Sequence, residues 1–199
     1  MTAEHHHDDR WLPSHWVADL GDGLQLRELS EAHHDPFWQA VDAGRADLSQ
    51  WMDWPRDLTR AESDAEVARL CRQASLGAQV PVVVEVHGQF AGQASLYGIS
   101  RFLRVAEITY WLCPPFRGRA IATRTVAALV THAFEEMAMA RVHARAAVEN
   151  HASRAVLERC GFTHEGTARS AFLVNGRRQD LALYGVLPGE LRAPASSTR

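Results

Sequence analysis

A single run of the chain, residues 107–123, combines features that few folds can accommodate. It is typical of a strand that includes residues 107–112, followed by a Pro-Pro pair that cannot continue a strand, an Arg-Gly-Arg loop and the first turn of a long helix. The first backbone N–H groups of such a helix have no partner within it, and they face outward at the positive end of the helix dipole. The run therefore predicts an anion site, for example for phosphate, at the helix start.

The length and composition of the chain favour one folded domain with short tails. With 199 residues, of which 46% are hydrophobic and 23% charged, it can form one well-buried core. We expect an N-terminal tail over residues 1–20, a domain over 21–188 and a C-terminal tail over 189–199. A net charge of -3 argues against a nucleic-acid-binding surface across the whole protein. With no signal-peptide pattern and no long apolar run, we expect a cytoplasmic protein without membrane segments.

The cysteines and histidines do not form a recognisable metal or disulfide pattern. Cys71, Cys113 and Cys160 are odd in number and widely spaced, which favours reduced thiols over a disulfide framework or a zinc site. The His5-His6-His7 run lies on a polar stretch that is typical of a disordered tail, where no neighbouring groups orient histidines toward a metal. We therefore expect no metal site.

Hydrophobic periodicity predicts a mixed α/β class, with mixed α+β layers rather than a doubly wound sheet. The hairpin turns are expected at His87-Gly88-Gln89 and at Asn175-Gly176. Within the second helix, the side chains expected on the buried side are Ala65, Val67, Ala68, Leu70 and Cys71. Strands are predicted at 24–29, 80–86, 90–97, 105–112, 141–148, 166–174 and 178–187, and helices at 31–43, 59–76, 118–138 and from Asn150 to about residue 160.

The segment from Leu48 to Pro55 is unusually aromatic for a connection between two helices. Its tryptophans, Trp51 and Trp54, admit two interpretations. They can plug the end of the core, or they can form a wall that faces a substrate, because loop tryptophans supply contact area at low entropic cost. The sequence leaves both open.

The order of elements, together with several short motifs, resembles the GNAT superfamily of acyl-CoA-dependent N-acyltransferases. Within it the chain is most similar to the RimJ/RimL group, which acetylates the N-terminal residue of ribosomal proteins. The likeness covers Leu24 to Leu187 and implies a mostly antiparallel central sheet, splayed at the acyl-CoA site and flanked by helices. Its marks are Leu48 with Trp51, residues 106–112, the Arg117-Gly118-Arg119 loop, Asn150 with Ser153, Gly161-Phe162, Glu165-Gly166, Val174-Asn175-Gly176, Asp180 and Tyr184.

The resemblance implies acetyl-CoA as co-substrate and places its binding residues along the opening run and the helix that follows Asn150. The family has a glycine where this chain has Ala120. A positive φ at that position would make the methyl group cost about 1 kcal/mol, whereas a helical φ would make alanine harmless. We expect Ala120 to lie in the first helical turn. The implied binding residues are Trp111, Leu112, Cys113, Arg117, Gly118, Arg119, Ala120, Ile121, Ala122, Thr123, Asn150 and Ser153.

The implied reaction is attack of an amine on the thioester carbonyl, with departure of a thiolate. Glu107 is the first candidate for the base that deprotonates the amine, and the alternative is a structural acid paired with an arginine such as Arg145. Ser153 is expected to stabilise the leaving thiolate. Asn150 and Ser153 also suit the N-cap and N3 positions of a helix. Phe172 stands where one RimL-type group has a glutamate suggested as catalytic, so that base cannot be carried over. Trp51, Trp54 and Phe172 are the candidate substrate-binding residues.

The identity of the acceptor and the acyl donor stays open at the level of sequence. The acceptor can be a ribosomal-protein N-terminus, a polyamine or another small amine, and succinyl-CoA is an alternative donor. A CoA-binding sensor or interaction module without turnover is the competing class, because Ala120 and Phe172 depart from family patterns. A homodimer is one assembly that the sequence leaves open.

Overall fold

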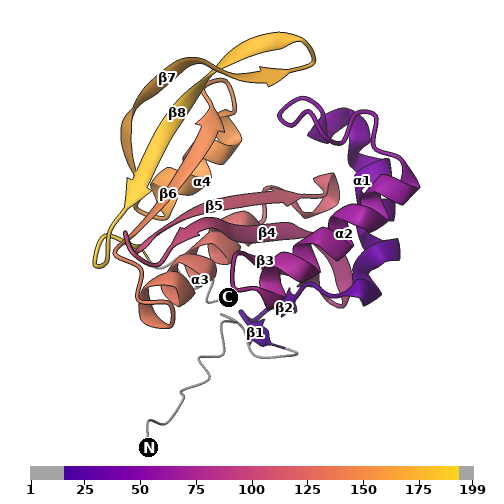
Figure 1. The fold of residues 1–199 in the computed structure, drawn as a ribbon, viewed down its shortest axis with the longest axis horizontal. Coiled ribbons are helices and arrows are strands. Elements are labelled where there is room, and N and C mark those ends of the chain that lie inside the picture. The colour runs from indigo at the N-terminus through magenta and orange to yellow at the C-terminus, as the bar shows by residue number, and fades with distance from the viewer. Residues whose placement is uncertain (1–15, 193–199) are drawn as a thin grey trace, which may run out of the picture.

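An eight-stranded sheet forms the centre of the computed structural model, which describes residues 16–192 (Figure 1). The strand order is β1-β2-β3-β4-β5-β6-β8-β7, and every neighbouring pair is antiparallel except β5 with β6, which is parallel. The expectation of a mostly antiparallel sheet is confirmed. The strands are β1 (Val17–Asp19), β2 (Leu24–Glu28), β3 (Val80–Val86), β4 (Gln89–Ser100), β5 (Val105–Leu112), β6 (Arg141–Ala147), β7 (Thr163–Val174) and β8 (Arg177–Val186).

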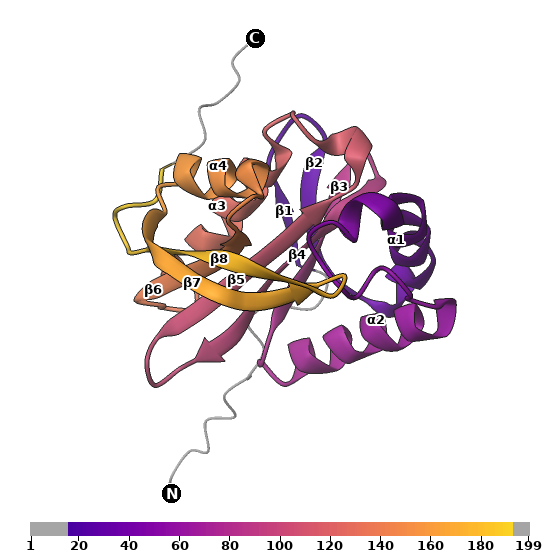
Figure 2. The same ribbon diagram turned by 90° about the horizontal axis from the view of Figure 1, so that it is seen from above.

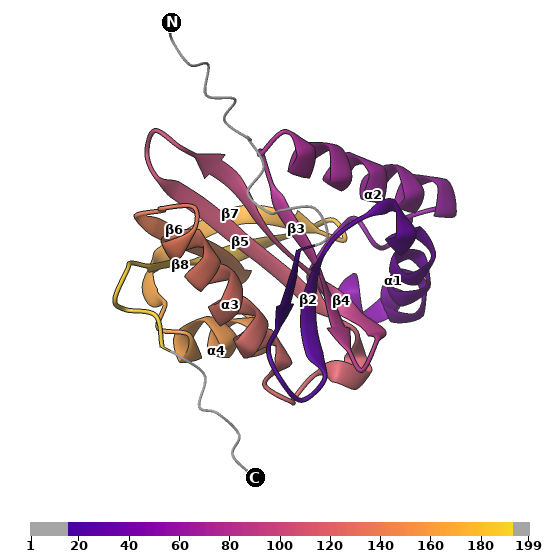
Figure 3. The same cartoon turned by 90° about the horizontal axis from the view of Figure 1, so that it is seen from below.

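Helices cover both faces of this sheet, as Figures 2 and 3 show from opposite sides. The larger core cluster joins α3 and α4 to one face, and a smaller cluster joins α1 and α2 to the other around Trp111. Among residues 16–192, no helix combines the length and the apolar character needed to cross a membrane. The helices are η1 (Glu31–His33), α1 (His34–Leu48), α2 (Arg60–Ser75), η2 (Pro114–Phe116), α3 (Ile121–Glu135) and α4 (His151–Arg159).

The two parallel strands at the middle of the sheet separate after a short paired stretch. The register pairs Val105, Ala106 and Glu107 of β5 with Arg141, Val142 and His143 of β6, and no pair follows in the described chain. We call this point of separation the fork. On the far side of β6, pairing with β8 continues as far as Ala147. The edge of β5 that faces β6 is therefore left without a strand partner beyond Glu107, which confirms the expected splay.

Several predicted boundaries differ from the observed ones. Val17–Asp19, which the sequence assigned to the tail, pairs with β2 as β1, and its three residues are too few to give a periodic signal. The first long helix starts later and runs on to Leu48, after the 3-10 turn at Glu31–His33. The helix predicted from residue 118 starts at Ile121, because the loop before it continues to Ala120.

The buried side of α2 differs in part from the prediction. Val67 and Leu70 are buried as expected, but the third buried residue is Ser63, and Ala65 is exposed. Ser63, Val67 and Leu70 follow the i, i+4, i+7 spacing of one helix face, and Ala65 lies two residues from Ser63, on the opposite face.

The His5-His6-His7 run lies outside the described residues.

Gly92 allows β4 to approach the end of β5 closely. It pairs with Leu112 on one side and Val84 on the other, and its φ is +156°. A Cβ atom at this position would lie 2.2 Å from the Trp111 carbonyl oxygen and 2.9 Å from the Leu112 Cα atom. Because backbone atoms cannot move aside cheaply, this stretch of the sheet accepts only glycine at residue 92.

We predict that Gly92→Ala lowers the free energy of unfolding by about 2–3 kcal/mol through overpacking against backbone. Urea denaturation should show a lower midpoint with an unchanged slope. Gly44→Ala is the control, because Gly44 lies inside α1 and a Cβ atom added there would lie 3.5 Å from its nearest neighbour, Leu48 Cδ1. Alanine at this position should stabilise the helix by up to about 1 kcal/mol. Equal effects of the two substitutions would contradict the assignment.

Candidate active site

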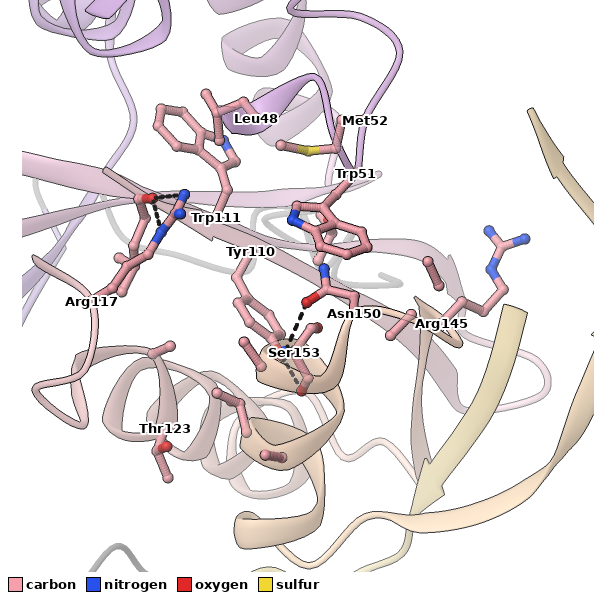
Figure 4. Close-up of a pocket in the computed structure, with 18 of the residues that line it drawn as sticks. Leu48, Trp51, Met52, Tyr110, Trp111, Arg117, Thr123, Arg145, Asn150 and Ser153 are labelled. Atoms are coloured by element: carbon pink, nitrogen blue, oxygen red, sulfur yellow. Dashed lines mark hydrogen bonds between the residues drawn. The ribbon is translucent and has the colours of Figure 1, made fainter. Parts of the chain in front are cut away.

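A cavity of about 790 Å³ lies where β5 and β6 separate (Figure 4). Its walls come from the start of α3, from α4, from the α1–α2 connection and from the β7–β8 hairpin. Cys113, Arg119 and Trp54 are the predicted site residues that do not line it. The predicted site residues that do line it are Trp51, Glu107, Trp111, Leu112, Arg117, Gly118, Ala120, Ile121, Ala122, Thr123, Asn150, Ser153 and Phe172.

The start of α3 presents a row of unpaired hydrogen-bond donors to this cavity. In the described chain, the backbone N–H groups from Gly118 to Thr123 donate to no backbone carbonyl, and the first to do so is that of Arg124, to Ala120 at 3.0 Å. The Thr123 hydroxyl is also buried without a hydrogen-bond partner. Buried or aligned donors without partners are the recognised signature of an anion site at a helix start. The start of α3 therefore has the unpaired N–H donors that the predicted anion site needs.

Ala120 is not in the first helical turn, and that prediction is wrong. It is the N-cap residue of α3, with φ 56° and ψ 7° in the left-handed region. Gly118, two residues earlier, also has a positive φ of 71°. Both left-handed residues lie in the loop that enters α3, within the stretch whose N–H groups donate to no backbone carbonyl in the described chain. The methyl group of Ala120 therefore carries the conformational cost of about 1 kcal/mol that glycine would avoid.

The side chain of Arg117 points back to the end of β5 rather than outward as a free charge. Its Nε and Nη2 donate to the Leu112 carbonyl oxygen at 3.0 and 2.8 Å (Figure 4). Nη2 also lies 2.5 Å from an Asp47 carboxylate oxygen. Sequence reasoning expected this charge, with that of Arg119, to serve the anion. Instead, the guanidinium ties the last residue of β5 to α1.

A further cavity cation, Arg159, was not predicted from the sequence. It is the last residue of α4 and lines the cavity together with Ala152 and Val156. The signal was present, because residues 152, 156 and 159 follow the i, i+4, i+7 spacing of one helix face. The prediction considered only the first turn of α4, where the family motif lies.

The start of α4 brings two hydroxyl groups together. The Asn150 side chain accepts a hydrogen bond from the Ser153 N–H at 3.1 Å, which confirms the predicted N-cap and N3 positions. The Tyr110 hydroxyl lies 3.0 Å from Ser153 Oγ and donates to the Ser153 carbonyl oxygen at 3.1 Å (Figure 4). Burial raises the pKa of Tyr110 above its ordinary value, so the phenol stays protonated at neutral pH. Because the Tyr110 proton is donated to that carbonyl oxygen, the Ser153 hydroxyl is the donor that the pair can offer at the cavity wall.

Tyr110 was also missed as a site residue, although its position could be read from the strand. Alternation along β5 places Tyr110 on the same face as Ala106 and Ile108, the face that α3 and α4 cover. A tyrosine on that face of a strand carries its hydroxyl well beyond the backbone. The sequence does not indicate which helix residue that hydroxyl meets, because the contact depends on how α4 packs.

Glu107 lies at the fork and is held by neighbouring hydrogen-bond donors. It is 8% exposed, its carboxylate accepts from Arg145 Nε at 2.7 Å, and His143 Nε2 lies at 3.3 Å. Burial alone would raise the pKa of Glu107, but hydrogen bonds from His143, Arg145 and Tyr97 outweigh it and hold the pKa at about 2. The pairing with Arg145, which the sequence analysis named as the alternative to a base, is therefore present.

The aromatic segment divides between its two interpretations. Trp51 lines the cavity, as does Phe172 from β7. Trp54 instead stacks on Phe37 of α1 with ring centroids 6.2 Å apart, and meets Trp111 edge-on at 6.4 Å. One tryptophan therefore faces the cavity, while the other covers the end of the smaller core cluster.

The cysteines of the described chain are free thiols in environments that weaken them as nucleophiles. Burial raises the pKa of Cys113, and it raises the pKa of Cys160 to about 11. A thiol at such a pKa is overwhelmingly protonated at neutral pH and reacts slowly. Residues 16–192 also contain no group of three or more metal-ligating side chains placed to share an ion.

Comparison with known proteins identifies the architecture. A family model described as an acetyltransferase (GNAT) domain matches residues 24–163. The putative ribosomal N-acetyltransferase YdaF of Bacillus subtilis is 45% identical over 103 residues, which are 52% of this chain and 56% of that protein. The chain thus spans little more than half the length of this relative. The ribosomal-protein-serine acetyltransferase of Escherichia coli is 25% identical over 168 residues, covering 83% of this chain and 93% of that protein.

Solved structures agree with this family match. A RimL ribosomal L7/L12 alpha-N-protein acetyltransferase in complex with coenzyme A superposes with a TM-score of 0.83 and 28% identity, covering 86% of this chain and 98% of that chain. Mycobacterium smegmatis RimJ in complex with CoA-disulfide superposes with a TM-score of 0.79 and 28% identity, covering 85% and 84%. The predicted fold and family resemblance are confirmed.

We predict that Ala120→Gly raises the free energy of unfolding by about 0.5–1 kcal/mol, because glycine adopts the left-handed conformation without the methyl cost. Ala122→Gly is the matched control, since Ala122 lies in the first turn of α3, where glycine should cost about 1 kcal/mol. Urea denaturation of both variants measures the difference. A loss of stability in both would mean that residue 120 does not carry this cost.

Proposed function

Because the chain belongs to the GNAT acetyltransferase family, we propose that it transfers the acetyl group of acetyl-CoA to the N-terminal amine of a protein. The acceptor class is that of the relatives named ribosomal-protein acetyltransferases. One observation carries the proposal, namely the row of unpartnered N–H groups from Gly118 to Thr123 beside the open edge of β5. A pyrophosphate and an amide-rich pantetheine arm need donors and acceptors in this arrangement.

The residues present fit such a donor. The N–H groups and the orphan Thr123 hydroxyl offer hydrogen bonds to phosphate oxygens, and Arg159 adds a positive charge at the cavity wall. The edge of β5 beyond Glu107 can pair with amides of an extended chain, as an added strand would. The helix start at Asn150 and Ser153 closes the other side of that channel.

In the transfer, a bond forms between the amine nitrogen and the acetyl carbon while the carbon–sulfur bond breaks and the sulfur leaves as thiolate. We assign to Ser153, whose Oγ lies 3.0 Å from the Tyr110 hydroxyl oxygen, the hydrogen bond that stabilises that thiolate. A thiol has a reference pKa near 8.5 and is a fair leaving group, so positioning contributes more than acid strength. The amine must lose one proton to become neutral before it attacks, and its nitrogen gives up a second proton as the amide forms, which the thiolate or solvent takes up.

We assign Glu107 a positioning role rather than that of the base. A carboxylate whose pKa is about 2 takes a proton from an ammonium group with a pKa near 8 only at a large free-energy cost. Its charge instead holds the guanidinium of Arg145 across the fork. The acceptor amine then reacts from the fraction that is already neutral, with its proton lost to solvent.

The charge of the cavity favours a peptide terminus over a polyamine. Among the described residues that line it, Glu107 is the acidic side chain and is paired, whereas Arg117, Arg145 and Arg159 are cationic. A polycation such as spermidine, the substrate in the name of one group of relatives, would find no unpaired carboxylate there. A peptide needs only its neutral terminal amine at the fork.

The activity test counts free thiol released from acetyl-CoA with a panel of amines. Peptides with a free serine or alanine N-terminus should release thiol, whereas the same peptides with a formylated N-terminus should release none, and spermidine should be at least tenfold slower. Binding of acetyl-CoA without thiol release in the presence of any amine would favour the alternative of a CoA-binding sensor or interaction module without turnover. Faster release with spermidine than with peptides would overturn the acceptor class.

We predict that Glu107→Gln lowers kcat/KM for a peptide by about tenfold at every pH from 6 to 9. With a pKa of about 2, Glu107 is ionised throughout this range, so its titration does not change kcat/KM between pH 6 and 9. Activity should rise with pH up to the pKa of the acceptor amine, near 8, in both proteins, since only the neutral amine attacks. A loss that shrinks toward pH 9 would make Glu107 the base.

A further inference from the structure

We propose that Asn175, at the tip of the β7–β8 hairpin, is a positioning residue that joins the two walls of the acceptor side of the cavity and sets the distance between them. The inference rests on the proposed function, because it concerns how an acceptor amine is held. Figures 1 and 2 show the hairpin reaching across toward the connection between α1 and α2. These two segments lie more than a hundred residues apart in the sequence.

Three hydrogen bonds join the hairpin tip to the α1–α2 connection. The Asn175 Nδ2 group donates to the Ser49 carbonyl oxygen at 2.7 Å, and its Oδ1 accepts from Arg56 Nη1 at 3.2 Å. The backbone N–H of Asn175 donates to Asp53 Oδ1 at 3.3 Å. We call this set of contacts the hairpin bridge. Asn175 uses its side-chain donor, its side-chain acceptor and its backbone donor on the same neighbouring segment.

The bridge residues lie close in sequence to two of the aromatic residues that line the cavity. Trp51 lies between the bridge residues Ser49 and Asp53, and Phe172 precedes Asn175 by three residues. Holding the tip to the connection therefore holds Phe172 and Trp51 relative to each other. An acceptor that enters between them meets a gap whose width is set by the bridge.

Both sides of the bridge are themselves anchored. On the α1–α2 connection, Arg45 Nη1 donates to the carbonyl oxygens of Pro55, at 2.5 Å, and Arg56, at 3.2 Å, so the segment is fixed to α1. On the hairpin, Val174 is only 2% exposed, although it adjoins the turn. A buried valine at the end of a hairpin means that the tip packs against a surface rather than standing in solvent.

The turn alone does not account for these contacts. Asn175 has a φ of 52° and Gly176 a φ of 72°, which suit the Asn-Gly pair of a two-residue hairpin turn. Glycine or aspartate at residue 175 would serve that turn equally well. Only the side-chain amide provides both the donor for Ser49 and the acceptor for Arg56. Substitution of Asn175 by glycine therefore removes these two hydrogen bonds and keeps the turn.

The test measures steady-state kinetics of Asn175→Gly with a free-amine peptide. The KM for the peptide should rise threefold to tenfold, while kcat and the KM for acetyl-CoA stay within twofold, because the bridge touches neither the fork nor the start of α3. The variant should also accept peptides with bulkier first residues relatively better. His87→Gly is the matched control, since His87 has a φ of 49° before Gly88 at another exposed hairpin tip, remote from the cavity.

The loop side of the bridge provides an independent variant. Asp53→Ala removes the acceptor for the Asn175 N–H and should raise the peptide KM in the same way, whereas Asp53→Asn keeps an oxygen at that position and should restore it. An unchanged peptide KM in both Asn175→Gly and Asp53→Ala would overturn the proposal, as would an equal rise in His87→Gly.

Amide hydrogen exchange separates this proposal from the proposed function, because it needs no turnover. Residues 49–56 should exchange at least threefold faster in Asn175→Gly than in the wild type or in His87→Gly. Faster exchange, together with no release of thiol from acetyl-CoA with any amine, would support the hairpin bridge and overturn the acetyltransferase activity. Unchanged exchange would overturn the bridge itself.

Discussion

The separation of β5 and β6 after three paired residues is the constraint on which the rest of the site depends. Two parallel strands that stop pairing inside a sheet leave backbone groups that must find other partners. Here the gap is bounded by the starts of α3 and α4, whose own first N–H groups also lack partners within the helices. Unsatisfied polar groups of the sheet and of a helix start are thereby concentrated at one place, and an extended polyanionic ligand can satisfy both.

The loop that enters α3 shows how backbone geometry and residue choice are linked at this place. Left-handed residues can direct successive N–H groups into an anion-binding concavity, and the chain has such residues before α3 at Gly118 and Ala120. Alanine is an uncommon choice, and its cost is about 1 kcal/mol. That cost is tolerable in a folded protein with several kcal/mol of stability, but it is not detectable in a helix-propensity pattern, where alanine is the best residue.

Local patterns predicted much of this molecule, and contacts between distant segments account for what they missed. The strand from Val105 to Leu112 and the N-cap at Asn150 follow from periodicity and capping chemistry, which act within a few residues. The positive φ of Ala120, the meeting of Tyr110 with Ser153 and the contacts of Asn175 with the α1–α2 connection depend on where other elements lie. Family resemblance supplied the architecture but not these side-chain contacts.

Each end of the open edge of β5 is held by an arginine whose charge is paired with a carboxylate. At the fork, Arg145 of β6 pairs with Glu107, and at the far end Arg117 donates to the Leu112 carbonyl oxygen while Asp47 pairs with its charge. Each acid costs desolvation free energy that its partner offsets, and removing either partner would leave a charge uncompensated. Because both guanidiniums are engaged, we propose that phosphate is bound mainly by the backbone N–H groups at the start of α3, which donate to no backbone carbonyl in the described chain.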